Sequence, residues 1–417
     1  MGVAGLRTPG QAGVSGGAVD IEYQDLASPQ FKANPYPFYA RLRAESPVHR
    51  MKQSFWLPTV WVVSRYADVL AVLKDDRFSN DFTSKMPWTP RSTRALTHTM
   101  LNRDPPDHTR LRALVNKAFT PRVVEAMRTR VQALCNDLLD AAEARGGVGL
   151  VRDYALPVPL TIISELLGVP REDRQQFAGW SKKVAAGTSG NLVDLLLGQP
   201  ALFRSVRYLR KLIARRREEP GDDLVTALVE AEEAGDRLSE DELVGMVALL
   251  LLAGYETTIN LVAVGTLTLV QHPAERARLL AEADLVEPAV EELLRYTSPA
   301  DIAAFRIARE DVTVAGTAIP RGAIVLCALS SANRDERQFP DPDRLDLGRD
   351  PNRHLAFGGG PHFCVGAPLA RLEGQIALST LFRRFPNLRL GVPAESLRWR
   401  RALIFRGLDE LPIELGT

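Results

Sequence analysis

Cys364 lies in the segment whose residue types are best suited to chemistry, a glycine-rich loop from Ala356 to Gly366. Pro368 indicates that a helix starts directly after this loop. The N–H groups at a helix start create a positive potential, which lowers the pKa of a thiol and stabilises a thiolate. A thiolate in this position could act as a nucleophile or as a metal ligand.

Three interpretations of this loop are open. The glycines from Gly358 to Gly360 could form a surface turn beside a buried, inert Cys364. His362 and Cys364 could form a hydrolytic dyad, but the two-residue spacing is awkward and no oxyanion-hole motif or third member accompanies them. In the third interpretation the glycines let the backbone approach a flat ligand, and Phe357 shields that ligand with its ring.

A second group of candidate residues lies inside residues 244–270, an apolar segment whose single charge is Glu256. Small Ala253 and Gly254 leave room beside the predicted helix. Glu256 and Thr257 place an acid next to an alcohol in a dry core, which suits proton delivery. The alternative is a capped or water-bridged glutamate in an ordinary core helix.

The same segment is long enough to cross a bilayer. Glu256 and the neighbouring threonines sit at its middle, where burial in lipid is costliest, and no basic flank marks a cytoplasmic side. A helix that is apolar all round is also what the centre of a large soluble protein needs. We therefore expect a core helix and no membrane anchor, with a single-span membrane protein as the alternative.

The pattern F-G-x-G-x-H-x-C-x-G resembles the cysteine-ligand loop of the cytochrome P450 superfamily in its soluble bacterial form. The resemblance covers nearly the whole chain. It implies a mostly α fold with a smaller β portion, the cytochrome P450 fold, with heme b (iron protoporphyrin IX) between the long central helix and the cysteine-loop helix. Cys364 would be the metal ligand, and Phe357, Gly358, His362 and Gly366 would help bind the cofactor.

Other positions match the same family. Glu292 and Arg295 form an E-x-x-R pair on one helix face, and Arg344 matches the arginine that joins this pair in the family. The Ala253–Thr258 segment resembles the oxygen-binding segment. That resemblance implies that Ala253 and Gly254 lie beside the heme, and that Glu256 and Thr257 are the catalytic proton-relay residues.

Four cationic residues match positions that hold the heme propionates. Arginine is suited to this task because it binds a carboxylate with two parallel hydrogen bonds. The set spans two predicted helices, a strand-like segment and the cysteine loop, and it consists of His108, Arg112, Arg306 and His362.

The resemblance implies an oxidoreductase, a cytochrome P450 monooxygenase that uses dioxygen to hydroxylate or epoxidise a small apolar organic substrate, with secondary metabolism as the setting. A ferredoxin and its ferredoxin reductase would donate electrons. Residues 103–130 contain seven Lys/Arg against three Asp/Glu and could form a docking face. The alternatives are a heme-thiolate peroxygenase, an oxidative-coupling enzyme, and a non-catalytic heme sensor.

Composition limits the other function classes. The net charge of +1 gives no bulk electrostatic argument for nucleic acid or an anionic membrane. Three widely spaced cysteines exclude a disulfide framework and fit a cytoplasmic location. We expect a flexible N-terminal tail over residues 1–21, one heme-thiolate monooxygenase domain over residues 22–417, and a monomer.

Hydrophobic periodicity predicts a mostly helical chain from Asp107 onward. The predicted helices cover residues 107–118, 121–143, 157–167, 171–187, 191–217, 221–233, 239–270, 273–281, 285–296 and 367–384. Strand-like runs lie at residues 61–63, 312–314 and 324–326, and residues 388–415 are predicted to be β-structure. Residues 79–101 are predicted to be a long loop.

Overall fold

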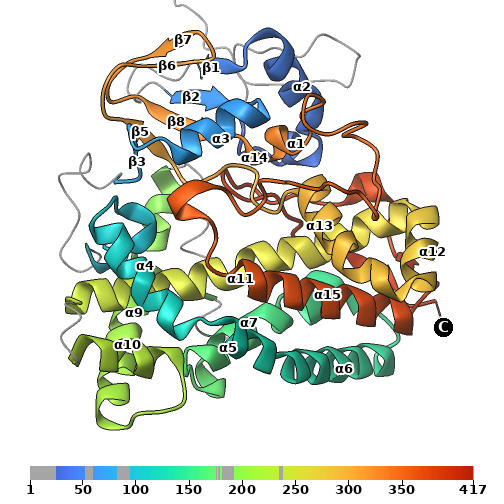
Figure 1. The fold of residues 1–417 in the computed structure, drawn as a ribbon. Coiled ribbons are helices and arrows are strands. Elements are labelled where there is room, and N and C mark those ends of the chain that lie inside the picture. The colour runs from blue at the N-terminus through green and yellow to red at the C-terminus, as the bar shows by residue number, and fades with distance from the viewer. Residues whose placement is uncertain are drawn as a thin grey trace, which may run out of the picture.

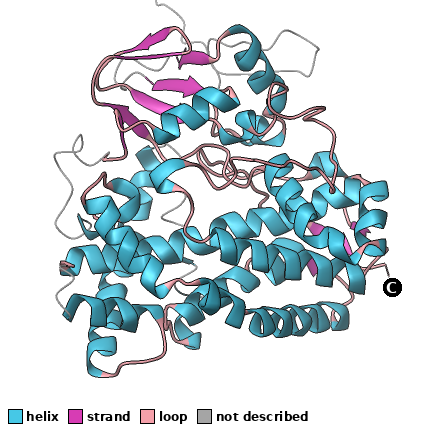
Figure 2. Ribbon diagram, viewed as in Figure 1, coloured by secondary structure: helices cyan, strands magenta, loops and turns pink. Residues whose placement is uncertain are grey.

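The computed structural model describes residues 25–51, 60–81, 94–174, 176, 179–180, 192–233 and 238–416. The predicted tail and part of the predicted 79–101 loop and 171–187 helix lie outside the described residues. Within the described part, most strands gather on one side of a larger helical body (Figures 1 and 2). The expected mostly α fold with a smaller β portion is confirmed.

Long helices form the helical body. They are α4 (Asp107–Ala118), α6 (Arg128–Ala144), α7 (Pro157–Leu166), α9 (Leu192–Glu218), α10 (Leu224–Glu233), α11 (Glu240–Gln271), α12 (Pro273–Ala281), α13 (Val286–Thr297) and α15 (Ala367–Arg384). Shorter helices are α1 (Pro29–Ala33), α2 (Tyr36–Glu45), α3 (Tyr66–Lys74), α5 (Pro121–Ala126) and α14 (Leu329–Ala332).

Proline and capping residues set several of these boundaries. Pro121 opens α5, and the Thr120 side chain accepts a hydrogen bond from the Val123 N–H. The prediction of a single helix over 121–143 is therefore wrong in one respect, because the structure divides it at Met127. The Met127 N–H donates to the Val124 carbonyl at the end of α5. The helices predicted at 107–118, 273–281 and 367–384 are confirmed at both ends.

Helix α11 is the central element of the helical body (Figure 1). It begins with a capping box in which Ser239 and Glu242 bond to each other's backbone N–H groups. By length and composition alone it could span a membrane, but 67% of its apolar 18-residue window is buried inside the protein. Its neighbours include α7, α13 and α15. The predicted core helix is confirmed.

Within the described residues, the β portion contains three small sheets. The largest has the strand order β1-β2-β8-β5-β3, and only its β2–β8 pair is parallel. Its strands are β1 (Val48–Met51), β2 (Val60–Val63), β3 (Phe78–Ser79), β5 (Arg306–Ala308) and β8 (Ile324–Cys327). A hairpin joins β6 (Val312–Val314) to β7 (Thr317–Ile319), and the third sheet joins β4 (Val148–Gly149), β10 (Pro412–Glu414) and β9 (Arg389–Leu390).

The prediction of β-structure over 388–415 is only partly correct. Strands β9 and β10 lie at its two ends. Between them the chain forms a looser hairpin, held by a bridge between Trp399 and Leu408 and by a hydrogen bond from the Arg400 N–H to the Gly407 carbonyl (2.9 Å). Pro393 has no N–H to donate, which interrupts regular pairing near the start of this hairpin.

Candidate active site

The cysteine loop lies directly before α15. The Cys364 N–H donates to the Phe357 carbonyl (3.0 Å), which closes the loop on itself. Gly360 has φ +67°, and a Cβ there would come within 2.5 Å of the Leu73 carbonyl oxygen on α3. Only glycine fits that position. The sequence predicted that the glycines let the backbone approach a flat ligand. At Gly360 the backbone instead approaches α3.

The Cys364 side chain keeps accessible surface although protein surrounds it. Burial raises the pKa of the thiol, whereas the N–H groups of Gly366 and Ala367 and the charge of Arg112 lower it. The N–H groups at the helix start therefore lower this pKa as predicted, but desolvation outweighs them. A coordinated metal ion deprotonates a thiol outright. N–H groups beside the sulfur then serve to orient and tune a thiolate ligand.

A network of side chains supports Phe357. The guanidinium of Arg371 lies over its ring, 4.6 Å from the centroid. Glu291 on α13 holds Arg371 with two hydrogen bonds of 2.7 and 2.8 Å and also contacts His354 at 3.2 Å. Burial alone would raise the pKa of Glu291, but the hydrogen bonds and charges of His354 and Arg371 lower it to about 2.

The predicted pair of Glu292 and Arg295 is fully buried on α13. Two parallel hydrogen bonds of 2.7 and 2.8 Å join the side chains. The third member of the group is Arg349, whose Nε lies 3.2 Å from Glu292 Oε1. The prediction of Arg344 is wrong: its side chain is exposed, and it contributes only its carbonyl, to Arg295 (3.4 Å) and Arg349 (3.1 Å).

The structure brings the four predicted propionate-binding residues together. The rings of His108 and His362 lie 4.1 Å apart between centroids. Burial and the nearby charges of His108 and Arg306 lower the pKa of His362 to about 3. Burial also lowers the pKa of Arg112 and of Arg306.

This cluster fits an anionic cofactor. His108 is 3% exposed, and neither of its ring nitrogens has a hydrogen-bond partner in the described protein. Asp104 is the acid whose charge acts on His108 and His362, and it also binds Arg309 at 2.6 Å. The charged guanidinium groups of Arg112 and Arg306 and the unpartnered ring nitrogens of His108 suit carboxylates such as the heme propionates.

The middle of α11 carries the predicted oxygen-binding segment. Ala253 is exposed although it lies within a largely buried helix, and Glu256 and Thr257 are half-buried. Gly254 faces α7, because a Cβ at this position would lie 2.8 Å from Ile163 Cγ1 on that helix. Its small size therefore allows α7 and α11 to pack closely, and room for a cofactor stays a prediction for Ala253.

Two polar partners of this segment were not predicted from the sequence. Arg400, from the C-terminal hairpin, pairs with Glu256 at 2.5 Å. Glu373, a fully buried acid on α15, lies near the hydroxyl of Thr258. Burial raises the pKa of Glu373 to about 8 against the opposing effect of that hydroxyl. Neither partner gives a local sequence signal, since each contact joins distant parts of the chain.

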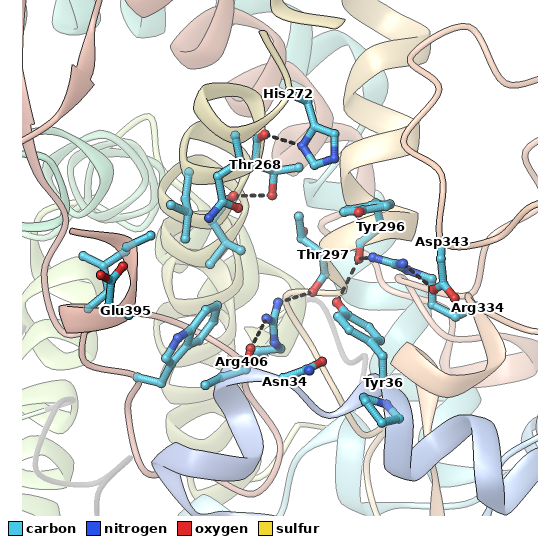
Figure 3. Close-up of a pocket in the computed structure, with 18 of the residues that line it drawn as sticks. Asn34, Tyr36, Thr268, His272, Tyr296, Thr297, Arg334, Asp343, Glu395 and Arg406 are labelled. Carbon is cyan, nitrogen blue, oxygen red and sulfur yellow. Dashed lines mark hydrogen bonds and ion pairs between the residues drawn. The ribbon is translucent and has the colours of Figure 1, made fainter. Parts of the chain in front are cut away.

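A separate cavity of about 590 Å³ lies elsewhere in the fold. Tyr36, Thr268, Tyr296, Arg334 and Arg406 are among its lining residues (Figure 3). The predicted catalytic and cofactor-binding residues do not line it. We therefore place the candidate active site around Cys364 and the middle of α11.

An accessible cysteine at a helix start, a cluster of basic side chains and an acid–alcohol pair on a central helix fit a heme-thiolate protein. The chain belongs to the cytochrome P450 family, whose family model matches residues 28–388. It is an oxidoreductase, a heme b-dependent monooxygenase.

Similar proteins agree with this assignment along most of the chain. "Polyketide biosynthesis cytochrome P450 PksS" of Bacillus subtilis is 43% identical, covering 93% of this chain and 97% of that protein. "Cytochrome P450 monooxygenase PikC" of Streptomyces venezuelae is 46% identical, covering 92% and 91%. The crystal structure of myxobacterial cytochrome P450 CYP267B1 in complex with myristic acid superposes with a TM-score of 0.89 at 42% identity, covering 94% and 99%.

Proposed function

We propose that Cys364 is the axial ligand and that His108, Arg112, Arg306 and His362 bind the propionates of the heme. The observation that carries this proposal is the accessible Cys364 thiol, with backbone N–H groups directed at its sulfur. Phe357, Gly358 and Gly366 complete the cofactor-binding loop.

When bound, the heme activates dioxygen so that one oxygen atom enters the substrate. The protein supplies protons and excludes water around this reaction. Glu256 would take a proton from solvent, and the Thr257 hydroxyl would hold a proton at the face of α11 where dioxygen is activated. Ala253 leaves space on the same side of α11. Because the acid is half-buried, it can contact both solvent and the interior.

The substrate we propose is a small apolar organic secondary metabolite. The names of similar proteins include a polyketide biosynthesis enzyme and a 6-deoxyerythronolide B hydroxylase. Substrate-induced spin-state shifts of the purified protein would identify binders from a panel of such molecules. Product analysis with labelled dioxygen then separates a monooxygenase, which incorporates the label, from a peroxygenase or a coupling enzyme.

We further propose that the protein is a cytoplasmic monomer that receives electrons from a ferredoxin and its reductase. The proposed docking face over residues 103–130 has less uncompensated charge than its composition indicates. Ion pairs join Arg103 to Asp81, Arg110 to Glu242, Arg128 to Glu125 and Arg130 to Glu165. Reduction by a ferredoxin should slow with rising salt concentration if this face binds the ferredoxin. A reduction rate that does not depend on salt would contradict the proposed docking face.

A Thr257→Ala variant tests the proton-delivery proposal. We expect it to consume reductant at a rate comparable to the wild type while it releases hydrogen peroxide in place of product, because the hydroxyl that delivers the proton is gone. Thr268→Ala is the matched control, since Thr268 lies on the same helix and its hydroxyl donates to the Val264 carbonyl of that helix (2.8 Å). Fully coupled product formation by Thr257→Ala would remove Thr257 from the proton path.

A further inference from the structure

The C-terminal hairpin contacts α11 at two residues one helical turn apart. Arg400 Nη1 lies 2.5 Å from Glu256 Oε1, and Arg400 Nη2 lies 2.5 Å from Asn260 Oδ1. Residues at i and i+4 share one helix face, so a single planar guanidinium can reach both. The side chains of Arg400 and Glu256 are 22% and 12% exposed. Water therefore screens this ion pair only in part.

Asn260 has an unusual environment for an amide. It is fully buried, and its Nδ2 has no hydrogen-bond partner in the described protein. A buried amide that leaves a donor unsatisfied is destabilising. Its Oδ1, however, accepts the hydrogen bond from Arg400. This arrangement indicates that Asn260 serves to orient the guanidinium beside Glu256.

The hairpin backbone fixes the arginine from the other side. The Arg400 N–H donates to the Gly407 carbonyl (2.9 Å), and the Asp409 N–H donates to the Arg398 carbonyl (2.9 Å). A Cβ at Gly407 would collide with Asn260 Oδ1 and approach Arg400 Nη2 to 2.6 Å. The two strands of the hairpin therefore come as close to α11 as glycine allows, directly over the contact between Arg400 and Asn260.

We propose that Arg400 is a positioning residue for proton delivery, which sets where the Glu256 carboxylate lies. Arg400 acts only through Glu256, so this inference rests on the proposed function of Glu256 as the relay. Two hydrogen bonds in a fixed fork restrict the guanidinium, and the guanidinium restricts the carboxylate. The C-terminal hairpin thereby controls a group on α11.

The test compares Arg400→Gln, Glu256→Gln and the double variant in the heme-loaded protein. We expect Arg400→Gln to lower product formed per reductant consumed about tenfold, the factor that corresponds to one charge-assisted hydrogen bond. The solvent isotope effect on product formation should rise, because proton delivery becomes slower. In the Glu256→Gln background, removal of Arg400 should have no further effect on either quantity. Arg400→Lys should restore part of the coupling, since it keeps the charge but loses the fork.

Controls separate positioning from folding. Arg398→Gln changes an exposed arginine on the same hairpin and should leave coupling unchanged. Heme content and the urea midpoint of each variant, measured without reductant, should show that Arg400→Gln is folded. The urea midpoints of the same set give a double-mutant cycle, in which the effects of changing residues 256 and 400 should not add.

Two failures are distinguishable. If Glu256→Gln forms product with full coupling, the proposed relay is wrong, and the positioning role fails with it. If Glu256→Gln is impaired but Arg400→Gln is fully coupled, the relay stands and the positioning role of Arg400 is overturned. The same conclusion follows if Arg400→Gln lowers the product formed per reductant as much in the Glu256→Gln background as in the wild type.

Discussion

The irregular segment that leads into the cysteine loop and the acid–alcohol segment of α11 are held in place in different ways. Buried ion pairs hold the irregular segment that leads into the loop: Glu292 and Arg295 are fully buried on α13, and Glu292 also binds Arg349 and Asn352 of that segment. The acid of α11 instead pairs with Arg400, which lies 144 residues further along the chain and remains partly accessible. The comparison indicates a rigid support for the segment that leads into the cysteine loop and an adjustable support for the proton relay.

Burial explains why the two supports should behave differently. An ion pair without solvent contact cannot open without leaving charges unpaired in the interior, which is strongly destabilising. A pair with some exposure can exchange a protein partner for water at small cost. Glu256 must exchange protons during the reaction, so an adjustable support suits it. Cys364 needs a fixed position.

The largest effect should come from breaking the rigid support. Glu292→Ala leaves Arg295 charged and buried without its carboxylate, so we expect a loss of about 3–5 kcal/mol in the free energy of unfolding. Urea denaturation would measure it, with heme content as a second readout. Glu287→Ala, an exposed position on the same helix, is the control and should change stability by no more than about 0.5 kcal/mol. A mild effect of Glu292→Ala would mean that the two supports do not differ.

An intermediate effect is expected at Glu373, which lies on the cysteine-loop helix but close to Thr258 on α11. Its pKa of about 8 exceeds the usual value of 4.5, so the folded state holds a proton that the unfolded state releases. Because the folded state binds the proton more tightly, the free energy of unfolding decreases progressively as the pH rises from 4.5 to 8. Glu373→Gln should remove that slope and stabilise the protein by a few kcal/mol at pH 8, since one pKa unit corresponds to about 1.4 kcal/mol.

Urea unfolding of the wild type and Glu373→Gln at pH 5, 6, 7 and 8 would check this. The gap between the two proteins should widen with pH over that range. A constant gap would mean that the carboxyl group is not neutral in the folded protein, and that α15 and α11 meet through a charged group.

A smaller effect should distinguish two arginines of the irregular segment before the loop. Arg349→Ala removes a hydrogen bond to the buried Glu292 carboxylate, and we expect a loss of about 1.5–3 kcal/mol. Arg344→Ala keeps the only group that residue supplies, its carbonyl, and should stay within about 0.5 kcal/mol of the wild type. Thermal unfolding of both would suffice; the reverse order would restore Arg344 as the third member of the group.

Local spacing determined which features the sequence could predict. The pair of Glu292 and Arg295 follows from an i, i+3 relation on one helix, and His108 and Arg112 share a face of α4 for the same reason. Arg349 could not be separated from Arg344, because the irregular segment has no periodicity that fixes the direction of a side chain. Arg400 was missed because nothing local indicates which strand of the C-terminal region reaches α11.

The fold followed the same rule. Helices bounded by proline or by capping residues were predicted nearly to the residue, as at α12 and α15. The C-terminal region was predicted as continuous β-structure, whereas its central hairpin makes irregular contacts that depend on α11. Long-range packing decided those contacts, and alternating hydrophobicity does not report it.

The carbon-monoxide spectrum of the reduced protein tests the central claim most directly. We expect the strongly red-shifted band of a thiolate-ligated heme in the wild type, its loss in Cys364→His, and its retention in Cys327→Ala, because burial raises the pKa of the Cys327 thiol to about 11. A wild-type protein that binds heme without ever showing this band, or a Cys364→His variant that keeps it, would contradict the assignment of Cys364 as the metal ligand.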